Sequence, residues 1–146
     1  MNGSVRDVMN WTSLTIRPEC PAAEAMAILA DADADTLFVV DAHDRFLGIV
    51  TGYELLKADL NGTLTEATAE QLMHRRSQSL TLDQPLGEAA KLFREAALSQ
   101  VPVLRDGRLL GVIDRKALLR FLTAQRSVST IARPKFLDRE TASVPC

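Results

Sequence analysis

The sequence is poor in the residues that mark several large classes of protein. It has two cysteines among 146 residues, Cys20 and Cys146, far apart and without the paired spacing of a zinc site, so we expect free thiols and no metal. Aromatic residues make up 5% and the formal net charge is −2, which disfavours a nucleic-acid-binding surface. No apolar run approaches the roughly 18 residues of a membrane span, and residues 1–10 lack the pattern of a signal peptide. We therefore expect a cytoplasmic protein that contacts neither membrane nor nucleic acid.

Motifs of the common enzyme classes are absent as well. The sequence has no nucleophile elbow, no metal-binding histidine pair, no glycine-rich dinucleotide loop and no P-loop. His43 lies in a polar turn, and His74 opens a short basic cluster at 74–76. We interpret both as solvated positions, although the cluster also suits a phosphate or an acidic partner. The sequence predicts a protein that is not an enzyme and carries no cofactor.

An internal repeat organises the chain. Apolar residues with the spacing of a helix, at positions 22, 25, 26 and 29, recur 64 positions later at 86, 89, 90 and 93. The same offset pairs Met9 with Met73. After a turn that is one residue shorter in the second copy, the offset becomes 63, and residues 46–50 match 109–113. A register held over this length indicates a duplicated structural unit.

Each copy is predicted to form a leading helix followed by β-α-β-β-α. The expected elements are 6–9, 13–16, 22–30, 37–40, 46–50 and 52–58 in the first copy, and 69–73, 79–82, 86–97, 101–104, 109–113 and 115–123 in the second. The strands are continuous apolar runs, so both of their faces should be covered. We predict an α/β fold in which two repeats, 1–62 and 63–126, pack through their sheets as a pseudo-two-fold pair. Residues 127–146 are expected to form a C-terminal arm or a disordered tail.

Three segments resemble those of a known family. Residues 5–9 (VRDVM) resemble the opening segment of the CBS domain, 98–103 (LSQVPV) resemble the approach to its second strand, and 48–54 (GIVTGYE) resemble its G-h-x-[ST]-x-x-D segment, where h is hydrophobic. From residue 5 to residue 126 the chain thus resembles a tandem pair of CBS (cystathionine beta-synthase) domains, or Bateman module. The resemblance implies a regulatory module that binds AMP, ADP, ATP or S-adenosylmethionine between its repeats, signals to a partner protein and forms a dimer.

The segment at 48–54 has a chemical reason to bind a nucleotide. A strand that ends before Thr51 delivers this residue to a helix N-terminus, where free backbone N–H groups and the helix dipole favour a phosphate. Gly52 allows close approach, and Glu54 offers two acceptor oxygens to neighbouring ribose hydroxyls. The same atoms also fit a capping box, in which Thr51 caps the helix and Glu54 reaches back to its backbone N–H. Glu54 replaces the family's aspartate and so displaces the carboxylate by one methylene.

The resemblance places the rest of the first cleft on neighbouring strands. Phe38 replaces a proline that is typical of the family, and it either stacks on an adenine or fills the pocket itself. The other residues expected to line this cleft are Thr15, Ile16, Leu37 and Ile49.

The second cleft departs further from the family pattern. Asp114 replaces the threonine, and Ala117 replaces the ribose-binding carboxylate. Asp114 is a good helix N-cap and would repel a phosphate, a repulsion that Arg115 and Lys116 partly offset. We expect this cleft to be empty or to take an uncharged group. The other residues assigned to it are Ser79, Val101 and Pro102.

Two functions follow from these observations. The first is a sensor in which an adenine nucleotide changes the angle between the repeats and so biases a partner protein. The alternative is a ligand-free dimerisation or docking module with degenerate sites, which the altered residues at positions 38, 54, 114 and 117 favour. Both predict a homodimer, because so small a unit leaves helix faces to cover. The sequence does not identify the partner protein.

Overall fold

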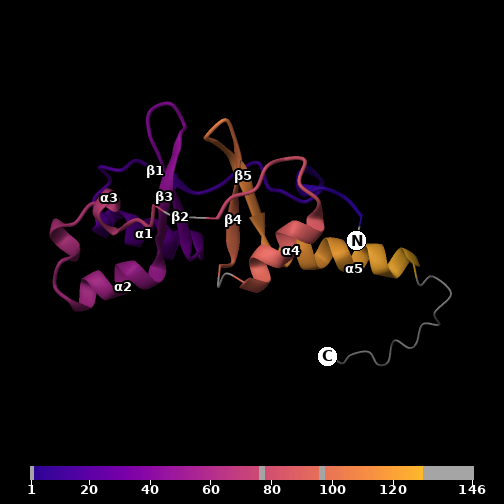
Figure 1. Cartoon of the computed structure of the whole chain (residues 1–146). Coiled ribbons are helices and arrows are strands. Elements are labelled where there is room, and N and C mark those ends of the chain that lie inside the picture. The colour runs from indigo at the N-terminus through magenta and orange to yellow at the C-terminus, as the bar shows by residue number, and fades with distance from the viewer. Residues whose placement is uncertain (1, 76–77, 96–97, 130–146) are drawn as a thin grey trace, which may run out of the picture.

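The computed structural model describes residues 2–75, 78–95 and 98–129, and it has two lobes that follow the two copies (Figure 1). The first lobe contains β1 (Thr15–Ile16), α1 (Ala22–Ala32), β2 (Thr36–Val40), β3 (Phe46–Thr51) and α2 (Gly52–Leu60). The second lobe contains α4 (Leu86–Glu95), β4 (Gln100–Arg105), β5 (Arg108–Asp114) and α5 (Arg115–Ser129). The leading segments are η1 (Val5–Asp7) before the first lobe, and η2 (Leu64–Glu66) and α3 (Ala69–Leu72) before the second. The predicted α/β fold of two repeats is confirmed.

The strands pair as the apolar runs predict. β2 and β3 form an antiparallel hairpin with Phe38 opposite Ile49, and β1 runs parallel to β2 with Thr15 beside Phe38. β4 and β5 form the equivalent hairpin with Pro102 opposite Val112. All five residues of β2 are buried, so both faces of this strand are covered, as its unbroken apolar sequence predicts.

The strand expected at 79–82 does not form. Leu80 makes a single parallel bridge to Val103, and the chain turns at the next residues. The N–H group of Arg6 donates to the carbonyl oxygen of Leu82 at 3.0 Å. The start of the chain therefore occupies a backbone group that a longer strand would have used.

Several element ends also differ from the predictions. Helix α5 continues to Ser129, past its expected end and past the start of the predicted tail. Because α4 ends at Glu95, the last two residues of the predicted helix, together with 130–146, lie outside the described residues. No helix in the described part of the chain is both long enough and apolar enough to cross a membrane.

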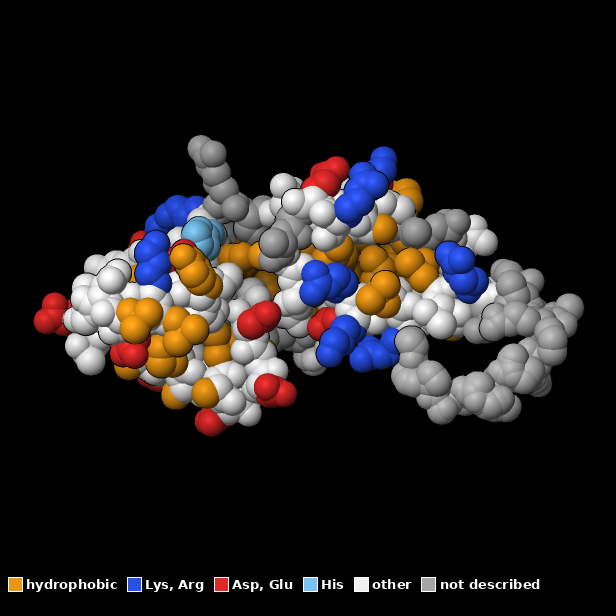
Figure 2. Space-filling model, turned by 90° about the horizontal axis from the view of Figure 1, so that it is seen from below, with side chains coloured by type: hydrophobic (Ala, Val, Ile, Leu, Met, Phe, Trp, Pro, Cys, Tyr) orange, Lys and Arg blue, Asp and Glu red, His pale blue; other side chains and the backbone are white. Residues whose placement is uncertain are grey.

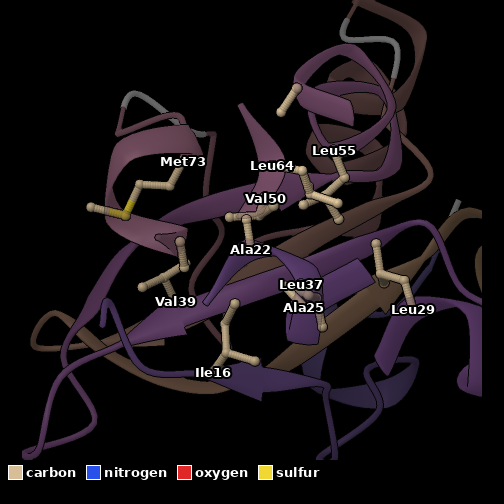
Figure 3. Close-up of a cluster of buried hydrophobic side chains, with 12 residues drawn as sticks. Ile16, Ala22, Ala25, Leu29, Leu37, Val39, Val50, Leu55, Leu64 and Met73 are labelled. Atoms are coloured by element: carbon tan, nitrogen blue, oxygen red, sulfur yellow. The ribbon is translucent and has the colours of Figure 1, made fainter. Parts of the chain in front are cut away.

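The leading segments exchange places between the lobes. Val5 and Met9, from the start of the chain, are buried in the core of the second lobe. Ala69 and Met73, from the start of the second copy, are buried in the core of the first, where Met73 lies near Val39 (Figure 3). Each lobe thus completes its core with apolar side chains from the other copy. This exchange stabilises the pair, because separation would expose both leading segments to water.

Equivalent residues of the two copies meet along a pseudo-two-fold axis. At the hairpin tips, Arg45 forms an antiparallel bridge with its counterpart Arg108. At the opposite ends of the strands, the hydroxyl of Ser99 donates to the carboxylate of its counterpart Asp35 at 2.9 Å. The lobes also share a buried apolar cluster of Phe38, Ile49 and Val112. These contacts confirm that the repeats pack through their sheets as a pseudo-two-fold pair.

Candidate functional site

The N-terminus of α2 holds the position at which the sequence predicts a phosphate. β3 ends at Thr51, whose hydroxyl oxygen accepts a hydrogen bond from the N–H of Glu54 at 3.3 Å, so Thr51 caps the helix. The N–H of Gly52 donates to the carbonyl oxygen of Asp35 at 3.0 Å. Of the first three N–H groups of α2, that of Tyr53 alone lacks a protein partner among the described residues. The expected set of free N–H groups is therefore wrong, because the chain itself uses two of the three.

The carboxylate of Glu54 faces the leading segment of the second copy. Its Oε2 lies 3.1 Å from Nε2 of His74, and the Glu54 side chain is 19% exposed. The backbone of His74 is fixed by two hydrogen bonds to Ile49, so the imidazole is delivered from an anchored position. The Glu54 side chain therefore does not return to the backbone N–H of Thr51 to complete a capping box. His74, which was interpreted as a solvated position, is half-exposed but also pairs with Glu54.

A pocket of about 250 Å³ opens at this end of α2. Both copies build it: Thr51, Gly52 and Tyr53 come from the first, and Leu98 and Ser99 come from the second. Asp35 and Thr36 complete the lining. Two of the predicted residues, Thr51 and Gly52, thus lie in a pocket between the repeats, whereas Glu54 lies outside its lining.

A second pocket, of about 390 Å³, opens at the equivalent end of α5. The carboxylate of Asp114 accepts a hydrogen bond from the N–H of Lys116 at 2.7 Å, which confirms the predicted cap. Three carboxylates and two cationic groups line this pocket; its residues are Asp33, Ala34, Asp35, Ser99, Gln100, Asp114, Arg115 and Lys116. Because Asp35 and Ser99 line both pockets, the two pockets adjoin at the pseudo-two-fold axis.

Three residues assigned to the clefts belong to the cores of the lobes. Ile16 and Leu37 are buried in the first lobe, and Val101 is buried in the second. Successive residues of a strand point to opposite faces, so Leu37 and Phe38 cannot both face the other repeat. In this structure these three residues therefore lie in the cores of the lobes and line neither pocket.

Phe38 faces the other repeat and fills the space itself. Its side chain is 1% exposed, clusters with Ile49 and Val112, and lies with its ring centroid 6.3 Å from that of Phe46. This arrangement favours the second of the two roles that the sequence allows for Phe38, in which it fills the pocket itself. Thr15 lies beside it on the edge strand β1 and remains exposed. In the second lobe the counterpart of Phe38 is Pro102, which is also buried, while Ser79 is exposed.

Asp35, Ser99 and Tyr53 line the first pocket and are absent from the prediction. Asp35 and Ser99 occupy equivalent positions, 64 residues apart and just before β2 and β4, so the repeat itself marks them as a pair across the axis. Tyr53 lies between two predicted residues, and its side chain is exposed. The equivalence of positions 35 and 99 in the repeat is the sequence feature from which this contact could have been predicted.

The two copies also match a known family in sequence. Residues 5–61 and 69–124 each match the CBS domain. The chain belongs to the CBS domain family. These matches cover both lobes together with their leading segments, so the chain is a CBS domain pair.

Solved structures share this architecture. The CBS domain pair of protein MJ0100, in complex with 5′-methylthioadenosine and S-adenosyl-L-methionine, is 26% identical and covers 82% of this chain and 99% of its own, with a TM-score of 0.72. CBSX2 in complex with AMP is 24% identical and covers 86% of this chain and 99% of its own, with a TM-score of 0.77, which shows the shared fold.

Two of the curated relatives are much longer than the matched region. L-aspartate semialdehyde sulfurtransferase of Methanocaldococcus jannaschii is 25% identical over 84% of this chain, and homoserine O-acetyltransferase of Methanococcoides burtonii is 30% identical over 82% of it. In both cases the match spans 24% of the relative's own length. The similarity therefore concerns only part of each relative.

Proposed function

We propose that this CBS pair is a regulatory module that binds an adenosine-containing ligand in its first cleft. The observation that carries the proposal is the pocket at the N-terminus of α2, where Thr51 and Gly52 of one repeat face Leu98 and Ser99 of the other. A ligand in this position touches both repeats, so its binding energy depends on their relative orientation. The ligands of the related pair from MJ0100 support the choice of adenosine as the common moiety.

The charges around the first pocket favour ligands without a phosphate. Among the described residues neither lysine nor arginine lines this pocket, and Asp35 places a carboxylate in it. The N–H groups of Gly52 and Glu54 are already used within the chain, so α2 offers little compensation for a phosphate. S-adenosylmethionine, with its sulfonium cation, and the neutral 5′-methylthioadenosine suit this surface better than AMP, ADP or ATP do.

We propose that the module transmits this binding to a partner protein through the relative position of the two lobes. The lobes are coupled by the exchanged leading segments and by the bond between Asp35 and Ser99, which lies in the wall of the pocket. A ligand that displaces this bond changes the packing at the axis. We also propose that the protein acts in the cytoplasm as a homodimer.

The second candidate function is a ligand-free dimerisation or docking module. Its support is the buried side chain of Phe38, which occupies the space between the sheets, together with the substitutions at Asp114 and Ala117 in the second cleft. In this alternative, Thr51 is simply a helix cap and Glu54 a partner for His74.

Thermal unfolding with a panel of ligands separates the candidates. At 100 times the Kd, one bound ligand adds about 2.7 kcal/mol to the free energy of unfolding, which gives a clear rise in Tm. The proposal predicts this rise with S-adenosylmethionine or 5′-methylthioadenosine, a smaller rise with AMP, and loss of both in Thr51→Ala/Glu54→Ala. Lys116→Ala, which alters the second pocket alone, is the control that keeps the response.

Three other results would count against parts of the proposal. A larger rise with AMP or ATP than with the phosphate-free ligands would overturn the charge argument. Loss of the response in Lys116→Ala instead would move the site to the second cleft. No rise with any ligand at millimolar concentration would favour the docking module. Each variant is compared with its own ligand-free Tm, so a change in intrinsic stability does not enter the comparison.

A further inference from the structure

The first pocket includes an exposed aromatic ring. Tyr53 is the only tyrosine of the chain, belongs to the lining of this pocket, and has a side chain that is 70% exposed. Single exposed aromatic residues are common on protein surfaces and do not by themselves indicate a ligand. Tyr53 differs from these because its ring shares a pocket with a large apolar side chain from the other repeat, Leu98.

Leu98 is held in place by the contact between the lobes. It lies just before β4, is half-buried, and packs against the apolar cluster of Phe38, Ile49 and Val112. Tyr53, in contrast, is carried by the first turn of α2. A planar group that packs against both side chains therefore contacts both repeats at once.

A cation lies over one face of the tyrosine ring. Nζ of Lys57, one helical turn further along α2, is 6.0 Å from the centroid of the Tyr53 ring. A cation at this distance is attracted to the electron-rich face of the ring and favours one orientation of it. The opposite face is the one that a ligand can use.

The second pocket lacks these apolar side chains at the equivalent positions. Each residue that lines the first pocket has its counterpart in the lining of the second, so the two surfaces can be compared position by position. Tyr53 corresponds to Lys116, and Leu98 corresponds to Ala34. Figure 2 views the molecule from the side of the helices and shows basic side chains gathered right of centre, over the second lobe. The first pocket thus suits a planar apolar ring better than the second does.

The space between the sheets is closed to such a ring. Phe38, which the sequence offers as a stacking partner for an adenine, is 1% exposed and is enclosed by Ile49 and Val112. Among the described residues that line the first pocket, Tyr53 is the one aromatic side chain. A purine that binds in this pocket therefore has Tyr53 as its stacking surface.

We infer that Tyr53 stacks on the purine ring of the ligand and that Leu98 packs against the ring from the other repeat. This inference rests on the proposed function and adds the residue that gives the first cleft its affinity for an aromatic ring. Stacking on an aromatic side chain needs no hydrogen bond to the base and is independent of the charge elsewhere on the ligand. Tyr53 should therefore strengthen binding of S-adenosylmethionine and of 5′-methylthioadenosine by the same factor.

Nuclear magnetic resonance tests the contact directly. Because the chain has one tyrosine, protein labelled with carbon-13 in its tyrosine ring reports on Tyr53 alone. Addition of 5′-methylthioadenosine should move the ring signals upfield, since the ring current of a stacked purine shields protons that lie over its face. The shift should saturate with the Kd that calorimetry gives. Methionine, which has no aromatic ring, should leave the signals in place.

Substitutions measure the contribution of the ring. Tyr53→Ala should raise the Kd for 5′-methylthioadenosine and for S-adenosylmethionine by roughly tenfold or more. Tyr53→Phe, which keeps the ring, is the matched control and should bind as the natural chain does. Leu98→Ala, which copies the second repeat, should raise the Kd by a smaller factor. The ligand-free Tm of each variant checks that it is folded.

The outcomes separate this inference from the proposed function. If the natural chain binds 5′-methylthioadenosine but Tyr53→Ala has the same Kd, or the ring signals do not move upfield, Tyr53 is not the stacking surface and the proposed function stands. A loss confined to S-adenosylmethionine would mean that the ring contacts the sulfonium cation instead of the purine. If the natural chain binds no adenosine-containing ligand, the proposed function fails and this inference fails with it.

Discussion

The two clefts are built on the same backbone and differ in the side chains at equivalent positions. Thr51 caps α2 in the first cleft, and Asp114 caps α5 in the second. Glu54 in the first is paired with His74 from the exchanged leading segment, whereas the counterpart of Glu54 is Ala117. The duplication therefore gives two equivalent positions, and these few side chains are the basis for proposing that the first of them binds a ligand.

The exchange of leading segments, in contrast, is the same in both lobes. His74 forms an antiparallel bridge to Ile49, and Asn10 forms the equivalent bridge to Val112. Each leading segment crosses a glycine, Gly48 or Gly111, at a distance that leaves no room for a Cβ atom. The lobes thus share the exchange of leading segments and differ in the side chains of their clefts, and the following changes test both halves of that statement.

The largest effect is expected from Phe38, which lies in the apolar cluster between the lobes and whose counterpart in the second lobe is Pro102. Phe38→Ala removes a side chain that is 1% exposed and should lower the free energy of unfolding by about 3–5 kcal/mol. Chemical denaturation measures it. Phe46→Ala, at the half-buried edge of the same cluster, should cost clearly less. Equal losses would mean that Phe38 does not fill the centre of the contact.

The glycine crossings should respond alike in the two lobes. A Cβ atom on Gly48 would lie 2.6 Å from the carbonyl oxygen of His74, and one on Gly111 would meet the carbonyl oxygen of Asn10 at closer range still. Gly48→Ala and Gly111→Ala should each cost about 1–3 kcal/mol, with the second the more harmful. Gly87→Ala is the control, because no atom lies within 4 Å of its Cβ position.

That control should be neutral or stabilising by up to about 1 kcal/mol, since alanine favours a helix over glycine. If Gly48→Ala were as mild as Gly87→Ala, the leading segment would not cross β3 as described.

Loss of either helix cap should lower the free energy of unfolding by a similar amount, but only loss of the Thr51 cap should weaken ligand binding. Thr51→Ala and Asp114→Ala should each cost about 1 kcal/mol in the free energy of unfolding, because each removes the side-chain acceptor at a helix N-terminus. Titration with 5′-methylthioadenosine after each change separates the roles: Thr51→Ala should weaken binding, and Asp114→Ala should leave it intact. The reverse pattern would exchange the roles of the two clefts.

The smallest effect concerns the turn of the first hairpin, where the second lobe has Arg105 in place of Asp41. The Asp41 carboxylate accepts hydrogen bonds from the N–H groups of His43 and Arg45, and these bonds lower the pKa of Asp41 below its ordinary value. The ionised form is therefore favoured by folding, so its contribution is present above the unfolded pKa and is lost as the pH falls through the folded one. Asp41→Asn should lower Tm slightly at neutral pH; the difference should begin to shrink near pH 4 and vanish only once the pH is below the lowered pKa of the folded state. A difference that stays constant with pH would reject the role of the carboxylate.

The elements of the fold could be predicted because their signals are local. The unbroken apolar run of β2 and the stripe at 22, 25, 26 and 29 each encode one element. The exchange of leading segments could not be predicted, since Met9 and Met73 are interchangeable apolar residues that fit either core. The absence of the strand expected at 79–82 also depends on a contact between distant segments, because the carbonyl oxygen of Leu82 accepts a hydrogen bond from the N–H of Arg6. Local sequence patterns do not encode such a contact.

The candidate site was predicted in part. Thr51 and Gly52 were found because their motif is continuous in sequence, and both line the first pocket. The positions of Leu37 and Val101 in the lobe cores could not be predicted, because a strand covered on both faces has no polar alternation to distinguish core from cleft. The partner of Glu54, His74, comes from the exchanged segment, so its role depends on the one feature of the fold that the local pattern does not encode.

Calorimetric titration of the chain with 5′-methylthioadenosine tests the central claim that one cleft of the two binds a ligand. The account predicts one ligand per chain, with binding lost in Thr51→Ala/Glu54→Ala and retained in Lys116→Ala. Two ligands per chain, or a single one lost in Lys116→Ala, would contradict the division between the clefts; no binding heat across temperatures would contradict the sensor itself.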